Sequence, residues 1–306
     1  MANTKEIKSH INSVRDTQKI TNAMYMIAST KMRKTKNDLD KTRPYFNALK
    51  GEIKRVFRTA EDVDSRYFYP ANGKELLSKT YACLVITADK GLAGAYNMNV
   101  IKEAEKLLAE HKDTKLFVVG EYGRQYFYHH NIPVERSFLY TAQNPTIHRA
   151  REISTILLDL YDKHEADKIF IIYTDFKNGM SADAISTRLL PFHRQQFFDS
   201  SVEKEVTSPF EFYPSVESIL DHMIQSYVSG FIYSALVDSF CSEQNARMTA
   251  MNSANQNAEK LLADLSVQYN RVRQSAITQE ITEISSGAKA QKNKRQKSRN
   301  EEAQSL

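Results

Sequence analysis

Proline, glycine and cysteine are scarce in this 306-residue sequence, and tryptophan is absent. The seven prolines all lie between Pro44 and Pro214, and the last glycine is Gly287. Because proline and glycine interrupt helices, the stretches before Pro44 and after Pro214 are predicted to form very long helices. The two cysteines, Cys83 and Cys241, show no CxxC spacing. Two cysteines without such a motif exclude a disulfide framework and favour a reducing compartment.

Long hydrophobic runs and recognisable catalytic motifs are also missing. No apolar run approaches the ~18 residues of a membrane span. The N-terminal residues MANTKEIKSH lack the features of a signal or transit peptide. The eight histidines are scattered, without an HExxH pattern or the Cys/His spacing of a metal site. We therefore expect a cytoplasmic, non-enzymatic protein without metal or cofactor, which reaches a membrane only through partners.

The net charge of +5 is distributed unevenly along the chain. Residues 1–58 contain fourteen Lys and Arg against five Asp and Glu, whereas residues 215–288 contain four against eight. Two long helices of opposite charge can pair with each other. A basic helix also admits a nucleic-acid adaptor, whose binding would be sensitive to salt. The mixing of these charges with an apolar seam favours a solvated coiled-coil face, without direct nucleic-acid binding.

Residues 1–58 are predicted to form the N-terminal helix of a coiled coil. Their apolar stripe is narrow, as in a coiled-coil seam, and recurs at the three- and four-residue spacing of one helix face. The stripe consists of Ile7, Ile11, Val14, Ala23, Met24, Ile27, Ala28 and Met32. Because proline removes a helical hydrogen bond, a kink or break is expected near Pro44.

Residues 80–208 change to the alternating pattern of a Rossmann-like α/β domain. Short apolar runs rich in strand formers are separated by helical stretches, which favours a mainly parallel sheet covered by helices. The expected strands are residues 81–87, 116–120, 133–138, 168–174, 187–192 and 195–198. The expected helices are residues 99–110, 123–129 and 145–161.

The loop at residues 89–94 (DKGLAG) follows a predicted strand and precedes a predicted helix. Nucleotide phosphates often bind at such a position. The loop matches neither the GxGxxG nor the GxxxxGKS/T pattern, however. A structural turn is the favoured interpretation, and an enzyme that binds a nucleotide on this domain is the alternative function.

Residues 214–288 are predicted to form the C-terminal helix, with Ser215 as its N-cap. Residues 216–240 are strongly apolar and aromatic, so they should be buried, whereas residues 241–287 are mostly small and polar. Their thin apolar seam ends with Ile277, Ile281 and Ile284. A helix of about seventy residues extends on the order of 100 Å, so part of it should project and pair with the N-terminal helix. The small polar surface suits a rod that contacts several surfaces in succession without permanent attachment.

Residues 289–306 form a basic tail without an apolar seam, with six Lys and Arg against two Glu. We expect this tail to be frayed or disordered.

Three blocks of sequence carry a family resemblance. The N-terminal block contains KEIK (residues 5–8), TQKIT (17–21) and STKMR (29–33), and the central block is ITADKGLAGAYN (86–97). The C-terminal block contains SEQNARM (242–248) and YNRVRQSAITQE (269–280), followed by SGA (286–288). In this order, over residues 1–288, the sequence resembles the gamma subunit of bacterial F-type ATP synthases.

The resemblance implies a non-catalytic central rotor stalk, which couples ion flow through a membrane ring to ATP synthesis or hydrolysis and regulates that activity. Its terminal helices would form an antiparallel coiled coil inside a ring of three alpha and three beta subunits. Its α/β domain would contact the epsilon subunit and the c-ring, on the cytoplasmic face of the cell membrane. Either protons or sodium ions could drive such a complex, because other subunits select the ion.

The resemblance also implies roles for particular residues. Arg273, Gln274 and Thr278 match positions where the shaft engages the catch loop of a beta subunit. Arg247 and Met24 match positions near the lever loops of beta subunits. The residues that match the foot facing the c-ring are Phe210, Glu211, Phe212 and Tyr213. The tail at residues 289–306 continues beyond the usual SGA ending of the family, and no role is implied for it.

Overall fold

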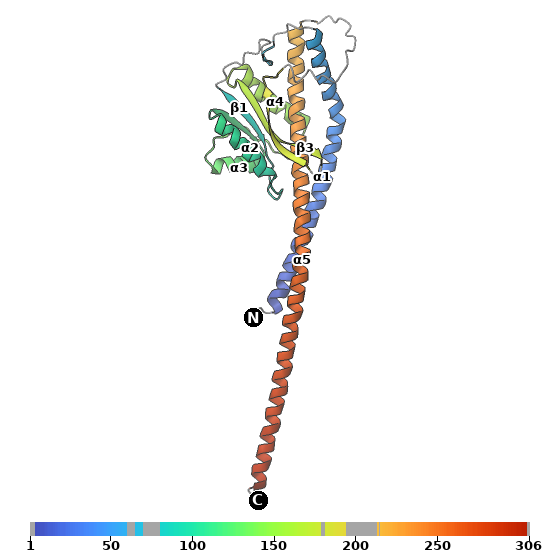
Figure 1. Ribbon diagram of the computed structural model, residues 1–306, viewed down its shortest axis with the longest axis vertical. Helices are drawn as coiled ribbons and strands as arrows, with labels where there is room; N and C mark the ends of the chain where they lie inside the picture. The colour runs from blue at the N-terminus through green and yellow to red at the C-terminus, as the bar shows by residue number, and fades with distance from the viewer. Residues whose placement is uncertain are drawn as a thin grey trace. The chain divides into compact units, whose positions relative to one another are not determined.

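The computed structural model describes residues 4–59, 65–69, 80–178, 181–193, 213 and 215–304 (Figure 1). These residues form two long terminal helices and a mixed α/β region between them, which confirms the expected fold class. The chain divides into two units. The larger unit is Tyr25–Ala250, and the smaller unit combines Met1–Met24 with Met251–Leu306.

The N-terminal helix, α1 (Thr4–Thr59), is continuous. The sequence predicted a kink or a break near Pro44. A break is wrong, because the helix runs through the proline, whereas the kink stays a prediction. A proline inside a helix costs about 3 kcal/mol through a lost hydrogen bond and a clash with the preceding turn. Packing on the C-terminal helix offsets this cost, since Phe46 lies against Gly230 and Tyr233.

The C-terminal helix, α5 (Val216–Gln304), is 89 residues long. It begins after Ser215, whose hydroxyl accepts a hydrogen bond from the Ser218 N–H at 3.2 Å, so the predicted N-cap is confirmed. The prediction of a frayed tail from residue 289 is wrong, because the helix continues to Gln304. Ala, Gln, Lys, Arg and Glu dominate this stretch, and all of them favour helices. Neither α5 nor any other helix in the described ranges is apolar enough to cross a membrane.

A four-stranded mixed sheet lies in the larger unit, in the order β2-β1-β3-β4. The strands are β1 (Tyr81–Ile86), β2 (Thr114–Val119), β3 (Lys168–Asn178) and β4 (Ser181–Leu190). The helices between the strands are α2 (Tyr96–Glu110), α3 (Glu121–His129) and α4 (Ile147–Asp162). β1 pairs in parallel with β2 and β3, whereas β3 pairs antiparallel with β4. The predicted parallel pairing therefore holds for the three strands that helices connect.

Of the other predicted strand segments, one is wrong, one is part of a longer strand and one is not described. Residues 133–138 do not form a strand. They follow the outer edge of β2 through a hydrogen bond from the Glu135 N–H to Leu116 O at 2.9 Å, and Pro133 has no N–H with which to extend the pairing. The segment predicted at 187–192 is the end of β4, and residues 195–198 lie outside the described residues.

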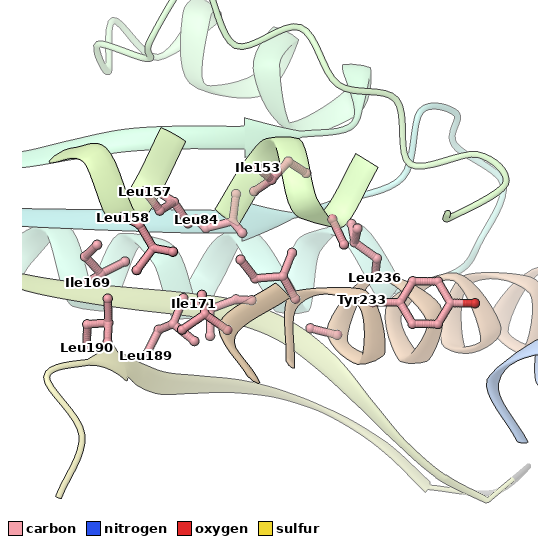
Figure 2. Packing of buried hydrophobic residues seen from close by; sticks show 14 of the residues in the cluster. Leu84, Ile153, Leu157, Leu158, Ile169, Ile171, Leu189, Leu190, Tyr233 and Leu236 are labelled. Atoms are coloured by element: carbon pink, nitrogen blue, oxygen red, sulfur yellow. The ribbon is translucent and has the colours of Figure 1, made fainter. Parts of the chain in front are cut away.

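The sheet is buried on both faces, as its continuous apolar strands require. On β1, Leu84 and Ile86 join a core with α4, α5 and the second half of α1, whereas Cys83 and Val85 join a core with α2 and α3. Figure 2 shows side chains of the first core, contributed by β1, β3, β4, α4 and α5 (Leu84, Ile169, Leu189, Ile153, Leu157 and Leu236). This core fixes the first turns of α5 on the sheet.

Candidate interaction surface

The first part of α5 is buried in the larger unit. Its apolar side chains lie at helical spacing in the core that covers one face of the sheet, and they include Leu220, Ile224, Val228, Ile232 and Leu236. Burial continues past Phe240, where the sequence predicted that it would end, through Cys241, Ser242, Glu243 and Gln244. We define residues 216–244 as the anchored half of α5.

A buried ion pair explains why burial continues past Phe240. Glu243 is 1% exposed, and its carboxylate accepts a hydrogen bond from Arg247 Nη1 at 2.5 Å. Arg247 Nη2 donates to the backbone oxygens of Gly91 at 3.0 Å and Lys90 at 3.3 Å. Burial raises the pKa of Glu243, and the Arg247 guanidinium opposes that rise. These four residues, which we call the Arg247 clamp, neutralise a buried charge and tie α5 to the loop after β1.

Asp89 holds the same loop on its other side. Its carboxylate accepts hydrogen bonds from backbone N–H groups at 3.2 Å and from one hydroxyl; the donors are Glu121, Ala142, Gln143 and the Thr141 side chain. Gly94 has a φ of 54°, a conformation that glycine adopts without strain. The fixed Asp89 carboxylate repels a phosphate group, and the Arg247 clamp holds the loop against α5. The loop therefore has the geometry of the structural turn favoured from its sequence.

Asp238 is a second carboxylate of α5 held inside the larger unit. Burial raises its pKa to about 6, and repulsion from Asp175 of β3 adds to this rise. Arg43 of α1 and a hydrogen bond from the Ser234 hydroxyl at 3.4 Å act in the opposite direction. The pKa of this carboxyl therefore lies between its ordinary range and neutrality, which makes the stability of the folded chain depend on pH.

In the smaller unit α1 and α5 pair antiparallel through a thin seam. Its buried residues are Ile7, Met251 and Leu265, with half-buried residues between them at heptad spacing. Two polar pairs cross the seam: the Thr21 hydroxyl donates to Asn255 Oδ1, and Gln18 Nε2 donates to Glu259 Oε1 at 3.4 Å. The small apolar area confirms the weak seam predicted from the sequence.

Beyond the seam, residues 273–293 of α5 are all exposed. The sequence placed Ile277, Ile281 and Ile284 in the seam, but these side chains are 46%, 61% and 73% exposed. That prediction is wrong for the described chain, in which no other segment covers them. We define residues 273–293 as the exposed half of α5.

Arg273, Gln274 and Thr278, the predicted contacts with a beta catch loop, lie on the exposed half. Gln274 and Thr278 are one helical turn apart and share a face with Ile277 and Ile281. The Thr278 hydroxyl donates to Gln274 O at 2.9 Å, and its oxygen can still accept a hydrogen bond. Arg273 forms no ion pair with any residue that the structure describes. This face therefore offers apolar, cationic and hydrogen-bonding groups to a partner.

Arg247 and Met24, the predicted contacts with lever loops, are less available than the residues of the exposed half. The Arg247 side chain is 13% exposed and engaged in the clamp, and Met24 is half-buried. Other apolar side chains are more exposed on the neighbouring turns of α1, namely Ile20, Met26 and Ile27. Ile27 is therefore not a seam residue, contrary to the prediction, and the buried residue at that turn is Ala28.

Of the residues predicted to face the c-ring, the structure describes only Tyr213, whose side chain is exposed. Phe210, Glu211 and Phe212 lie outside the described residues. Within the described ranges, no three His, Cys, Asp or Glu side chains form a group that could hold a metal ion.

Sequence reasoning missed the structural roles of Glu243 and Asp89. Each carried a signal. Glu243 precedes Arg247 by one helical turn, the spacing of an ion pair, and Asp89 follows a buried strand, where a side chain can cap neighbouring loops.

Comparisons with known proteins bear on this arrangement of two long helices around an α/β domain. Residues 3–291 match the family model described as ATP synthase. The ATP synthase gamma chain of Acetivibrio thermocellus is 40% identical over 297 residues, which cover 95% of this chain and 100% of the relative. This chain belongs to the ATP synthase gamma chain family. A gamma chain from Caldanaerobacter subterraneus subsp. tengcongensis is 41% identical over 292 residues, covering 93% of this chain and 98% of the relative.

A solved structure also resembles this gamma chain. It is the central stalk and c-ring of the mitochondrial ATP synthase of Tetrahymena thermophila, with a TM-score of 0.56 and 26% sequence identity. The match covers 77% of this gamma chain and 99% of the solved chain. The family resemblance read from the three sequence blocks is thereby confirmed.

Proposed function

We propose that this gamma chain is the central rotor subunit of a bacterial F-type ATP synthase. It couples ion flow through a membrane ring to ATP synthesis or hydrolysis at sites on other subunits, and it does no chemistry itself. Its partners are three alpha subunits, three beta subunits, an epsilon subunit and a c-ring. The complex lies on the cytoplasmic face of the cell membrane, and this chain reaches the membrane only through it.

The exposed half of α5 is the observation that carries this proposal. A helix that no other described segment covers is marginal in water, so a partner must surround it in the working protein. Its apolar groups are few and separated by small polar residues, so the contact energy with any one surface is modest. Such a face can be held and released repeatedly, as a turning shaft requires.

The mechanism follows from contact energies that differ between partners. Arg273, Gln274 and Thr278 project from limited sectors of α5, so at any moment the three beta subunits meet different faces of the shaft. A contact shifts a beta subunit between conformations only by the difference in contact energy between those conformations. Rotation of the shaft would therefore open and close each nucleotide site in turn.

The anchored half of α5 supplies the rigid connection that such a mechanism needs. The buried core and the Arg247 clamp fix residues 216–247 on the α/β domain. Torque applied to the domain is therefore passed to α5 through packed side chains, because packed cores resist deformation.

Native mass spectrometry of the detergent-solubilised complex tests the proposal. The expected result is one copy of this chain with three alpha and three beta subunits. A complex with equal numbers of all three chains would contradict it. Micromolar binding of ATP by the purified chain alone would instead favour the alternative of a nucleotide-binding enzyme.

A further inference from the structure

A cavity of about 660 Å³ lies in the larger unit where α1, α4 and α5 meet. This volume falls within the range of roughly 300–1,000 Å³ that small-molecule sites occupy. None of the predicted contacts with beta subunits or the c-ring lines the cavity. Its lining includes Tyr45, Phe46, Arg151, Ser154, Ser226 and Ser229.

One wall of the cavity is apolar and aromatic. Tyr45 and Phe46 of α1 meet edge to face with ring centroids 5.3 Å apart, and Tyr45 is exposed. Ile147 and Leu158 of α4 also line the cavity. Such a wall favours a flat apolar body, because aromatic pairs accept a third ring by stacking or by edge contact.

The floor of the cavity is polar but satisfied within the chain. The hydroxyls of Ser154 on α4 and Ser229 on α5 lie 2.7 Å apart. Each hydroxyl also lies 2.9 Å from a backbone oxygen of its own helix. Ser154 contacts Arg151 O, and Ser229 contacts Gln225 O. Because both serine hydroxyls are already hydrogen-bonded within the chain, the charged side chains of the lining decide which ligand the cavity prefers.

One cation of the lining has no carboxylate partner among the described residues. Asp159 pairs with Lys163 at 2.6 Å, and Lys41 lies 3.8 Å from Asp38. Asp162 shares the Arg66 guanidinium with Asp221, at 3.4 Å and 3.7 Å. Arg151 is exposed, and within the described ranges no carboxylate pairs with its guanidinium. A free guanidinium beside an apolar wall attracts an anion and can bind a carboxylate, sulfonate or phosphate in bidentate geometry.

We propose that this cavity binds a small amphipathic anion. Its flat apolar body lies against Tyr45 and Phe46, and its anionic group binds Arg151. Because residues of three helices line the cavity, the ligand bridges α1 and α4. Its binding raises the free energy of unfolding of the larger unit as the occupancy of the cavity rises. The anionic group is the carboxylate of an aromatic acid or the phosphate of a nucleotide-like molecule, since both join a flat ring to an anion that a guanidinium binds.

A matched pair of fluorescent probes tests the proposal on the purified full chain. 8-Anilinonaphthalene-1-sulfonate carries the anion, and N-phenyl-1-naphthylamine has the same aromatic body without it. Arg151→Gln should weaken binding of the sulfonate about tenfold, the loss expected for a hydrogen bond to a charged group, and leave the neutral probe unchanged. The matched control is Arg33→Gln, an exposed arginine of α1 that does not line the cavity.

Filling the cavity gives a second, independent arm. Ser226 is exposed at its lining, so Ser226→Trp should place an indole inside it and abolish binding of both probes. Ser253→Trp puts the same side chain on an exposed position of α5 away from the cavity and should leave binding intact. Thermal melts of each variant verify that the chain is folded. Competition by 1-naphthoate or by AMP then identifies the source of the anion.

Two results would overturn the proposal. One is sulfonate binding that survives Ser226→Trp, which would place the probe elsewhere on the chain. The other is equal weakening of both probes by Arg151→Gln, which would show that the arginine contributes packing rather than anion binding.

Discussion

The two halves of α5 share one continuous backbone but differ in what surrounds them. The anchored half, residues 216–244, is buried in a core shared with the sheet, α4 and α1. The exposed half, residues 273–293, has no cover from the described chain. The comparison teaches that a helix can be continuous along its length although tertiary packing stabilises only part of it. Packing fixes the first half in one position, whereas the second half keeps its helix through residue propensity and remains free to exchange partners.

The largest expected effect comes from the clamp that ends the anchored half. Arg247→Ala leaves the Glu243 carboxylate buried without its cation, which should lower the free energy of unfolding by about 3–5 kcal/mol. Urea unfolding of the purified chain measures this loss. Arg271→Ala, an exposed arginine of the same helix, should change stability by less than about 0.5 kcal/mol. Equal effects of the two substitutions would show that the Arg247 clamp stabilises the chain no more than an exposed arginine does.

Two glycines of α5 offer a matched comparison with opposite signs. A Cβ built at Gly230 in the anchored half would overlap the Phe46 ring, whereas one at Gly287 would meet nothing within 4 Å. Gly230→Ala should therefore destabilise the chain by about 1–3 kcal/mol, since an overpacked core must shift. Gly287→Ala should strengthen the local helix by about 0.5–1 kcal/mol. Thermal melting measures the destabilisation by Gly230→Ala. Slower amide hydrogen exchange around residue 287 measures the stabilisation by Gly287→Ala. A Gly230→Ala variant as stable as the native chain would contradict the packing described.

The pH dependence of the anchored half tests Asp238. Its pKa rises from 3.8 to about 6 on folding, so between these values the folded chain binds more protons than the unfolded chain. The free energy of unfolding therefore falls as pH rises from about 4 to about 6 and stays lower above that. Asp238→Asn removes this dependence and should be more stable than the native chain by about 1–2 kcal/mol at pH 8, with the difference shrinking towards pH 4.

Denaturant unfolding at several pH values measures the difference. Asp264→Asn, an exposed aspartate of α5, serves as the control. A native chain that gains stability between pH 4 and pH 6 relative to Asp238→Asn would reverse the sign and refute the account of this site.

In the exposed half, substitutions should affect the complex rather than the chain. Replacing Arg273, Gln274 and Thr278 together by Ala removes no buried contact, so the unfolding of the purified chain should change by less than about 0.5 kcal/mol. ATP hydrolysis by the assembled complex should fall roughly tenfold, because lost charged hydrogen bonds weaken the contact that shifts beta. A fully active triple variant would show that these side chains are not the contact.

The smallest effect is expected beyond the exposed half. The family match ends at residue 291, although α5 continues to Gln304. Deletion of residues 292–306 should therefore leave assembly of the complex intact. Gel filtration of the complex measures this, and loss of assembly would show that the tail is a structural element.

Much of the fold could be predicted because its signals are local. Apolar runs and changes of period located β1, β3 and α4, and composition separated the two halves of α5. The continuity of α1 could not be predicted, because it depends on contacts between Phe46 and Gly230 that lie far apart in sequence. The helix over residues 289–304 was not predicted, because this stretch has no apolar seam, although most of its residues favour helices.

The candidate site shows the same division. The small polar composition of residues 241–287 predicted a surface for transient contacts, and the family resemblance supplied candidate residues on it. The structure shows that residues 273–293 are exposed, and the contacts themselves stay predictions. The Arg247 clamp could not be predicted, since it requires a loop 156 residues away in sequence to lie beside α5. The contact of Arg247 with a beta lever loop stays a prediction, and in the described chain its side chain binds Glu243 and the loop after β1.

Rotation of the α/β domain relative to the alpha and beta subunits tests the central claim most directly. Cys83 and Cys241 are buried, so a bead can be attached to a single introduced cysteine at the exposed Leu139 (Leu139→Cys) in an immobilised complex. With ATP supplied, the account predicts rotation in one direction, with three pauses per turn. A complex that hydrolyses ATP while the bead stays fixed would contradict it.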